Sequence, residues 1–317
     1  MATEPQVTER PVTQVTRRRR GNPVSWVKSG GLTTLLFALP MTLVFLVFSW
    51  NPIVRSVIMS FQKTNLITAP EWVGLDNFQA VLSDPLLGTA VLNTMYFAFL
   101  ALILGFPIPI IMAVLMSEVR RGKGLYSALA YLPVVIPPVV SVLLWRVFYD
   151  ASPNGVFNVM LGFFGIPPQP FLQSQTQAMP ALVIEATWAA AGGSIIIYLA
   201  ALLIVPPELY DAAEVDGANI WRKIWHVTLP QLRGVLFVML ILQIIATAQI
   251  FLEPFLFTGG GPANATVTVL LLIYRYAFTN SLGGQYGMAT ALSVMLAVFL
   301  AIISWIYFRL TSRWSTS

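Results

Sequence analysis

The stretch PELYDAAEVDGANIWRKIWHVTLP, residues Pro207–Pro230, is a polar interruption between two long apolar segments. Its apolar side chains recur at helical spacing, which predicts two short helices on either side of Asp216-Gly217. A glycine at the break is typical of a left-handed helix end or of a close backbone approach. Pro230 is expected to restrict the second helix and to pass the chain to the next apolar segment. On periodicity alone, an amphipathic loop on the bilayer surface is an equally good interpretation.

Composition places the whole chain in a membrane. Of its 317 residues, 57% are hydrophobic and 10% are charged, and the mean hydropathy is +0.76, far from the balance of soluble domains. The chain has no Cys and one His, His226, which excludes disulfides and thiolate metal sites, so we expect no metal and no cofactor. The net charge of +5 is scattered over membrane-flanking positions, so no nucleic-acid partner is expected.

Six apolar stretches are long enough to cross a bilayer, which takes about 20 residues. We therefore predict an all-α integral membrane protein with six transmembrane helices. Prolines inside these stretches are expected to bend the helices. The predicted spans are residues 32–50, 88–117, 125–148, 179–205, 234–256 and 285–308, in a domain of residues 32–310 between a disordered cytoplasmic tail, 1–31, and a short cytoplasmic tail, 311–317.

The distribution of Lys and Arg predicts the orientation, because cytoplasmic loops carry an excess of both residues. If the amino terminus lies inside, fourteen of the 18 Lys and Arg residues fall on the cytoplasmic side, including Arg17–Arg20. Only Arg55, Lys63, Arg146 and Arg275 fall on the other side. Both termini and residues 207–230 are therefore predicted to be cytoplasmic.

The polar stretch resembles the EAA motif of binding-protein-dependent ABC importer permeases, E-A-A-x3-G-x9-I-x-L-P. Here Asp211 replaces the glutamate and Val227 the isoleucine, while the spacing to Gly217 and Pro230 is kept. The resemblance implies the type I ABC importer permease fold, with residues 207–230 as the coupling loop that docks on a separate ATPase. The coupling residues implied are Asp211, Ala212, Ala213, Asp216, Gly217, Trp221, Arg222, Val227, Leu229 and Pro230.

The outer loops resemble sugar-type permeases of the same family. Trp72–Phe78 and Gly155–Asn158 match segments that carry short outer helices there, and Thr258–Pro262, TGGGP, is similar to a region of permeases related to the maltose transporter's F subunit. The resemblance implies a prokaryotic inner-membrane permease that forms half of a sugar or oligosaccharide channel. The implied partners are a second homologous permease, an ATP-binding subunit dimer, an extracytoplasmic solute-binding protein and the lipid bilayer. No Gly-rich run is followed by Lys-Ser or Lys-Thr, so ATP must be bound by another polypeptide.

The predicted fifth span offers a candidate solute path. Gln249 and Glu253 are four residues apart, so we expect them to share one helix face and to line a cavity beneath the TGGGP turn. Apolar and aromatic surface completes a site for sugars. The candidates are Gln249, Phe251, Glu253, Phe255, Gly259 and Gly260. For Gln243 and Thr247, hydrogen bonding between helices is an equally good interpretation.

Three competing functions can be compared with these residues. A permease for glycerol phosphate or polyamine belongs to the same superfamily, but few Lys or Arg lie in the spans to bind phosphate. An intramembrane enzyme needs a cluster of catalytic groups, whereas the only membrane-depth acids are Glu185 and Glu253. An ion-coupled secondary transporter typically shows inverted repeats, for which the sequence gives no convincing sign.

Overall fold

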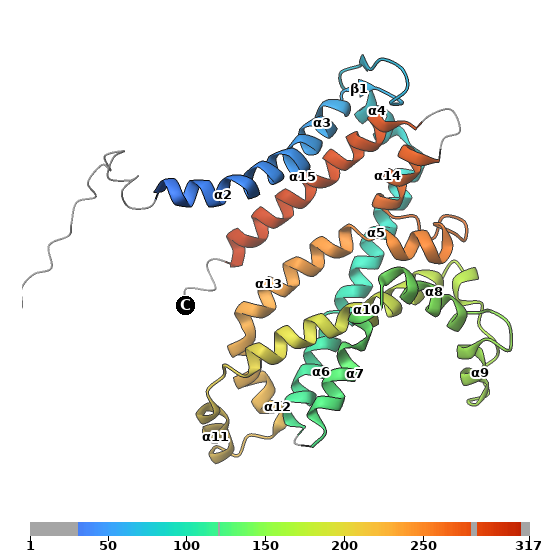
Figure 1. The fold of residues 1–317 in the computed structure, drawn as a ribbon. Helices are drawn as coiled ribbons and strands as arrows, with labels where there is room; N and C mark the ends of the chain where they lie inside the picture. The colour runs from blue at the N-terminus through green and yellow to red at the C-terminus, as the bar shows by residue number, and fades with distance from the viewer. Residues whose placement is uncertain (1–30, 120, 280–283, 312–317) are drawn as a thin grey trace, which may run out of the picture. The chain divides into compact units, whose positions relative to one another are not determined.

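The structure is a computed structural model that describes residues 31–119, 121–279 and 284–311. Its regular elements within these residues are helices, apart from two short strands, β1 (Gln62–Lys63) and β2 (Glu71–Trp72), which pair antiparallel (Figure 1). The chain forms two compact units, Met1–Arg55 and Ser56–Ser317. The tails predicted at residues 1–30 and 312–317 lie outside the described residues.

The first helical segment begins with α2 (Gly31–Phe45), passes through a π-helical turn, η1 (Leu46–Trp50), and continues as α3 (Asn51–Met59). Together these elements make an apolar helix of 28 residues, Leu32–Met59, which extends past the predicted end at residue 50. The widened turn allows this extension, because the Asn51 N–H donates to the Leu46 carbonyl five residues earlier and the helix continues across Pro52.

Four more helical segments are long and apolar enough to span a bilayer, which confirms the all-α fold. One combines α5 (Pro85–Leu104) and α6 (Pro107–Glu118), and another is α10 (Ala178–Leu202). A third, Ile220–Ala248, joins α12, a π-helical turn and α13, and the last is α15 (Tyr286–Thr311).

The predicted span 125–148 is bent in the structure. Its halves, α7 (Lys123–Val135) and α8 (Pro138–Phe148), meet at 99°. Ile136 takes an extended conformation ahead of Pro137 and Pro138, because a residue before proline is disfavoured in the helical region. Counting this bent pair as one span gives the predicted six among the described residues.

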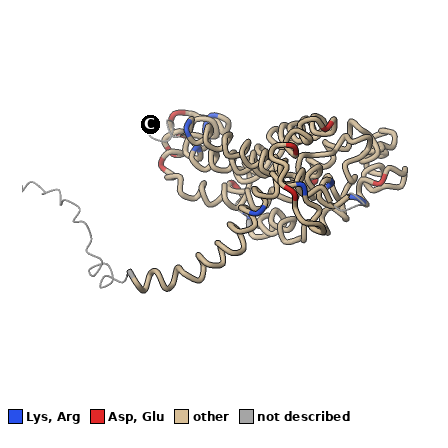
Figure 2. Tube along the Cα trace, turned by 90° about the horizontal axis from the view of Figure 1, so that it is seen from above, with Lys and Arg blue, Asp and Glu red and all other residues tan. Residues whose placement is uncertain are grey.

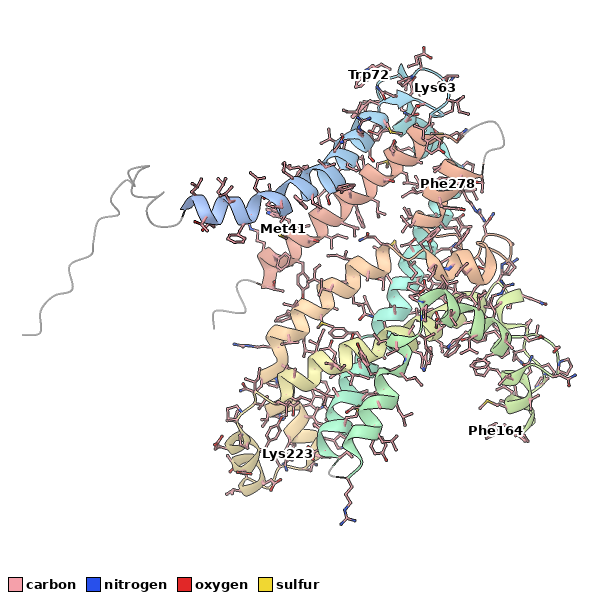
Figure 3. The ribbon with its side chains drawn as sticks, in the orientation of Figure 1. Met41, Lys63, Trp72, Phe164, Lys223 and Phe278 are labelled. Atoms are coloured by element: carbon pink, nitrogen blue, oxygen red, sulfur yellow. The ribbon has the colours of Figure 1, made fainter. Side chains whose placement is uncertain are left out.

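The unit Ser56–Ser317 is built around α10, which packs against α5, α6, α7 and α13. A second packing group joins α14 (Val269–Phe278), α15 and the short helix α4 (Asp76–Ser83). The helices α11 and α12 lie at the opposite end of this unit from β1 and α4, as Lys223 and Trp72 show in Figure 3. Most of the trace in Figure 2 carries no Lys, Arg, Asp or Glu.

The short helices predicted from the two loop segments are both present. The segment Trp72–Phe78 leads into α4, and Asn77 donates from Nδ2 to the Ser60 and Gln62 carbonyls at 2.9 and 3.0 Å. The other helix, α9 (Val156–Gly162), begins after Gly155. Buried or partly buried aromatic residues pack around Trp145 next to it, including Tyr149 and Phe157.

Candidate functional site

The first half of the polar loop is a helix that ends at a glycine, as the sequence predicts. Helix α11 (Pro207–Val215) is followed by Gly217 at φ +71°. The Ala218 N–H donates to the Ala213 carbonyl at 2.9 Å, and the Gly217 N–H donates to the Glu214 carbonyl at 3.0 Å. These two bonds define a Schellman motif, in which the left-handed residue favours glycine.

The second half of the loop is a helix that continues past Pro230 into the next apolar segment. The Asn219 side chain caps α12 (Ile220–Lys223) by accepting from the Arg222 N–H at 2.9 Å. The π-helical turn η3 (Ile224–Thr228) then leads directly into α13 (Leu229–Ala248). Leu229 donates to the Ile224 carbonyl five residues back, and this wider turn lets the helix continue past a proline that has no N–H to give.

Two contacts hold the halves of the loop together. The Lys223 ammonium donates to the Glu214 carboxylate, which holds the pKa of Glu214 below its usual range. The hydroxyls of Tyr210 and Thr228 lie 3.1 Å apart. The loop therefore keeps a defined shape of its own.

Most of the implied coupling residues are exposed on this loop. Trp221 is 68% exposed, and Trp225 beside it is also exposed. Among the implied residues, Asp211, Ala212, Asp216, Gly217, Trp221, Arg222 and Pro230 are exposed, whereas Ala213, Val227 and Leu229 are half-buried.

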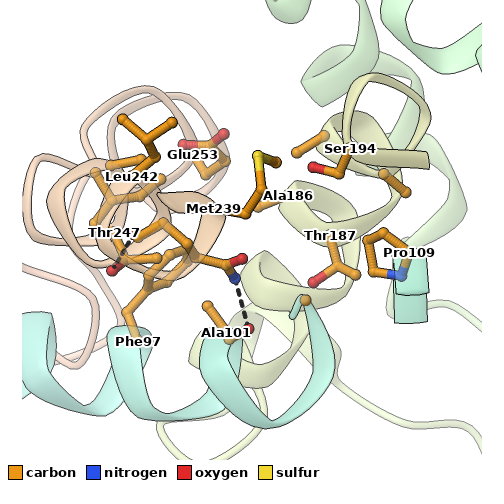
Figure 4. A pocket seen from close by; sticks show the side chains of 16 residues that line it. Phe97, Ala101, Pro109, Ala186, Thr187, Ser194, Met239, Leu242, Thr247 and Glu253 are labelled. Atoms are coloured by element: carbon orange, nitrogen blue, oxygen red, sulfur yellow. Dashed lines mark hydrogen bonds between the residues drawn. The ribbon is translucent and has the colours of Figure 1, made fainter. Parts of the chain in front are cut away.

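A cavity of about 320 Å³ lies between α5, α6, α10 and α13, and sixteen residues line it (Figure 4). The wall is apolar except for a few groups on three segments: Thr187 and Ser194 on α10, Gln243 and Thr247 on α13, and Glu253 after α13. Gln243 donates from Nε2 to the Ala101 carbonyl at 2.8 Å, and Thr247 donates to the Gln243 carbonyl at 2.9 Å. The first of these bonds confirms the interpretation that Gln243 forms a hydrogen bond between helices. Gln243 also lines the cavity.

Of the six candidates for the solute path, only Glu253 lines this cavity. The expectation that Gln249 and Glu253 share one helix face is wrong, because α13 ends at Ala248 and Gln249 is its C-cap. The exposed Gln249 donates back to the Ile245 carbonyl at 3.3 Å. The Ile250 carbonyl, beyond the helix end, accepts from Thr268 at 2.9 Å.

The aromatic candidates form a cluster of their own. Phe251 and Phe255 stack with ring centroids 5.1 Å apart, and the Phe255 ring lies 4.9 Å from that of Tyr274 on α14. Neither phenylalanine contributes to the wall of the cavity.

The two candidate glycines belong to a closely bonded turn after η4 (Pro254–Thr258). Gly259 and Gly260 have φ angles of +60° and +95°. Arg275 donates from Nη2 to the Gly259 carbonyl at 2.7 Å, and the Thr258 and Thr266 hydroxyls lie 2.6 Å apart. These contacts hold the TGGGP segment as a compact turn.

The second membrane-depth acid, Glu185, is only 1% exposed and lies outside the cavity wall. Its Oε1 accepts from the Ser141 hydroxyl at 2.5 Å, which ties α10 to α8. Its Oε2 has no hydrogen-bond partner.

The α10 side of the cavity was missed from the sequence, although a signal for it exists. Thr187, Ala190, Ala191 and Ser194 line the cavity, and their spacing of three, four and seven residues is that of one helix face. Within the described residues, no group of three or more His, Cys, Asp or Glu side chains is placed to hold a metal ion.

The chain resembles known transport proteins along most of its length. The family model described as "Binding-protein-dependent transport system inner membrane component" matches residues 105–316. The arabinooligosaccharides transport system permease protein AraP of Halalkalibacterium halodurans is 31% identical, over 95% of both chains. The polygalacturonan/rhamnogalacturonan transport system permease protein YteP of Bacillus subtilis is 34% identical, over 88% of this chain and 87% of its own.

Among solved structures, a chain of a bacterial ABC transporter involved in the import of the acidic polysaccharide alginate has a TM-score of 0.80. It is 27% identical, and the match covers 92% of this chain and 98% of that chain. The fold and these matches define a multi-pass membrane permease. This chain belongs to the family of inner-membrane components of binding-protein-dependent transport systems. That assignment decides against an intramembrane enzyme and against an ion-coupled secondary transporter.

Proposed function

We propose that this chain forms one half of the channel of an ATP-driven importer for a sugar or oligosaccharide. Its partners are a second homologous permease, a dimer of ATP-binding subunits and an extracytoplasmic solute-binding protein. The support for the solute class is that relatives matched along almost the whole chain carry the names of oligosaccharide or polysaccharide transport systems. The chain itself carries out no covalent step, and the work of ATP hydrolysis reaches it through residues 207–230.

The proposed orientation has both termini and the coupling loop in the cytoplasm. Its support is the excess of Lys and Arg on that side, where fourteen of 18 fall. The loop also has the features of a docking element: exposed Trp221 and Arg222, an exposed acid at Asp211, and an internally bonded shape. A rigid surface loses little conformational entropy on binding.

The proposed solute path passes the cavity walled by α5, α6, α10 and α13. Its support is the chemistry of the wall, which combines apolar surface with a few hydroxyl, amide and carboxyl groups, as small-molecule sites do. The remaining candidates continue this path at its outer end, since they follow α13 directly. They are Gln249, Phe251, Phe255, Gly259 and Gly260.

The observation that carries the coupling proposal is the left-handed Gly217, which sets the angle between α11 and α12. A β carbon at this position would contact nothing within 4 Å, so a substitution acts only through the backbone. A left-handed conformation costs an ordinary residue about 1–2 kcal/mol. Asn adopts it more readily than most residues, and a β-branched residue does so least readily.

We expect Gly217→Val to leave membrane insertion intact and to abolish most solute-stimulated ATP hydrolysis in the reconstituted importer. Gly217→Asn, the matched control, should keep most of it. Normal stimulation and uptake with Gly217→Val would show that the loop's shape does not serve coupling.

A further inference from the structure

We infer that the transported solute is uncharged, and that Glu253 makes the cavity select against anionic sugars. The inference rests on the proposed solute path and narrows it to one chemical class. It matters because the matched proteins differ in this respect: the solved transporter imports an acidic polysaccharide, alginate, whereas AraP is named for arabinooligosaccharides.

The cavity wall contains an acid and no base. None of the sixteen residues that line it is Lys or Arg, and Glu253 is its only ionisable member. The other polar groups, on Thr187, Ser194, Gln243 and Thr247, are neutral hydroxyls and an amide. Such groups can replace the water around sugar hydroxyls, but they cannot compensate a solute carboxylate, which needs a cation or several donors to leave water.

The two outer arginines nearest in sequence to this region, Arg146 and Arg275, form hydrogen bonds with groups outside the cavity wall. Arg275 donates to the Gly259 carbonyl at 2.7 Å and to Asn264 Oδ1 at 3.3 Å, so it holds the TGGGP turn. Arg146 donates to the Leu256 carbonyl at 3.3 Å. It lines a separate cavity that shares no residue with the first.

That separate cavity also offers no excess of positive charge. Asp150 lines it together with Arg146. The backbone N–H of Ser152 donates to Asp150 Oδ1 at 2.7 Å and lowers the pKa of this carboxyl, so that it is ionised at neutral pH. One Arg and one Asp leave the second cavity without net charge, and within the wall of the first cavity no cation of this chain compensates Glu253.

The sign of the effect follows from Coulomb's law. Two unit charges about 10 Å apart, at an effective dielectric constant of about 20, interact strongly enough to change an equilibrium or a local concentration by roughly tenfold. Glu253 is half-buried. Where its carboxyl is ionised, it lowers the concentration of a carboxylated sugar in the cavity and leaves that of a neutral sugar unchanged. Hydrogen bonding from sugar hydroxyls to the same carboxylate adds to the preference.

The absence of native Cys gives a direct test of the charge in the cavity. Ala190 and Ala246 both line the cavity and are exposed, so Ala190→Cys and Ala246→Cys give two reporters, each introduced into the complete importer. The measurement is the rate of modification by a cationic and by an anionic methanethiosulfonate reagent of similar size. We expect the cationic reagent to react faster, relative to the same ratio at Gln175→Cys, an exposed outer position.

The charge of Glu253 is then changed in the same backgrounds. Glu253→Gln should lower the ratio of cationic to anionic rates by roughly tenfold, and Glu253→Lys should invert it. A ratio that does not respond to Glu253→Gln overturns the inference, as does a lack of labelling at both cavity positions by both reagents.

Transport by the same importer separates this inference from the proposed function. Uptake of a neutral arabinose or glucose trisaccharide should exceed that of trigalacturonate, and Glu253→Lys should narrow the difference. Failure to take up any of the three, with the labelling ratio as expected, would contradict the sugar assignment and leave the charge assignment standing. Preferred uptake of trigalacturonate by the unmodified importer would overturn the charge inference while keeping the sugar function.

Discussion

Gly259 and Gly260 are adjacent, but their two positions favour glycine for different physical reasons. Gly259 and Gly260 both have positive φ, at +60° and +95°. A β carbon on Gly259 would meet nothing within 4 Å, whereas one on Gly260 would lie 2.5 Å from Arg275 Nη2 and 2.8 Å from Val267 Cγ2. The first position needs glycine only for its backbone angle, and the second also for space.

This difference gives a matched pair of substitutions. Gly259→Ala should lower the free energy of unfolding by about 1 kcal/mol, the cost of a left-handed alanine. Gly260→Ala should cost about 2 kcal/mol or more, because the clash also displaces the Arg275 side chain from the Gly259 carbonyl. Thermal unfolding of the detergent-solubilised permease measures both. Equal losses would mean that the turn moves aside without strain.

For single residues, the sequence predicts the backbone conformation where local geometry determines it. It does not predict where the chain leaves a helix. Gly217 could be predicted as a left-handed helix end because the break between two periodic patterns is local. Gln249 could not be placed, because the prediction assumed that the helix continues to residue 256. The chain leaves the helix where Thr268, eighteen residues later, binds the Ile250 carbonyl. No local pattern encodes that long-range bond.

At the level of elements, α10 decides how closely the helices of the Ser56–Ser317 unit approach. It crosses α7 at Gly192, where a β carbon would lie 2.5 Å from the Ala130 carbonyl oxygen and 2.9 Å from Val134 Cγ2. Small residues at such crossings let helix backbones pack closely inside membranes. Gly193, the next residue, would place its β carbon in open space.

The two glycines should therefore respond to alanine with opposite signs. Gly192→Ala should destabilise the permease by about 2 kcal/mol, since backbone must shift to admit the methyl group. Gly193→Ala should be neutral or stabilise it by up to about 1 kcal/mol, because alanine favours a helix over glycine. Unfolding of both variants in the same detergent tests this, and a harmless Gly192→Ala would refute the close crossing.

The sequence predicts the membrane-spanning helices well from the length of their apolar stretches. It predicts less well which prolines bend them. All six predicted spans have a counterpart, because a run of about 20 apolar residues has few alternatives in a membrane. Pro137 and Pro138 bend one span by 99°, whereas Pro52 and Pro230 lie within continuous helices. A π-helical turn precedes each of the latter two, and neither proline has a local sequence signal that predicts such a turn.

The orientation of the whole molecule in the membrane is predicted by the distribution of Lys and Arg, whereas the fold alone does not determine it. Val215, at the end of α11, is 90% exposed, and Gln175, between α9 and α10, is also exposed. The proposed orientation puts Val215 in the cytoplasm and Gln175 outside.

An impermeant thiol reagent distinguishes the two sides. With the permease expressed without its ATPase, Gln175→Cys should react in whole cells, and Val215→Cys should react only after permeabilisation. Both positions are exposed in the protein, so a difference reports the membrane and not local burial. Labelling of Val215→Cys in intact cells would reverse the orientation.

The helix that runs unbroken from Ile220 to Ala248 has a mechanical consequence. Its 29 residues correspond to a rod of roughly 40 Å, with Trp221 and Arg222 at one end and the cavity groups of Gln243 and Thr247 near the other. A stiff helix transmits a tilt along its length, so a displacement of the end that carries Trp221 and Arg222 is expected to move the cavity wall as well. The widened turn at Ile224–Thr228 is the one irregular point along its length, and it is where a change in helical register would be absorbed or released.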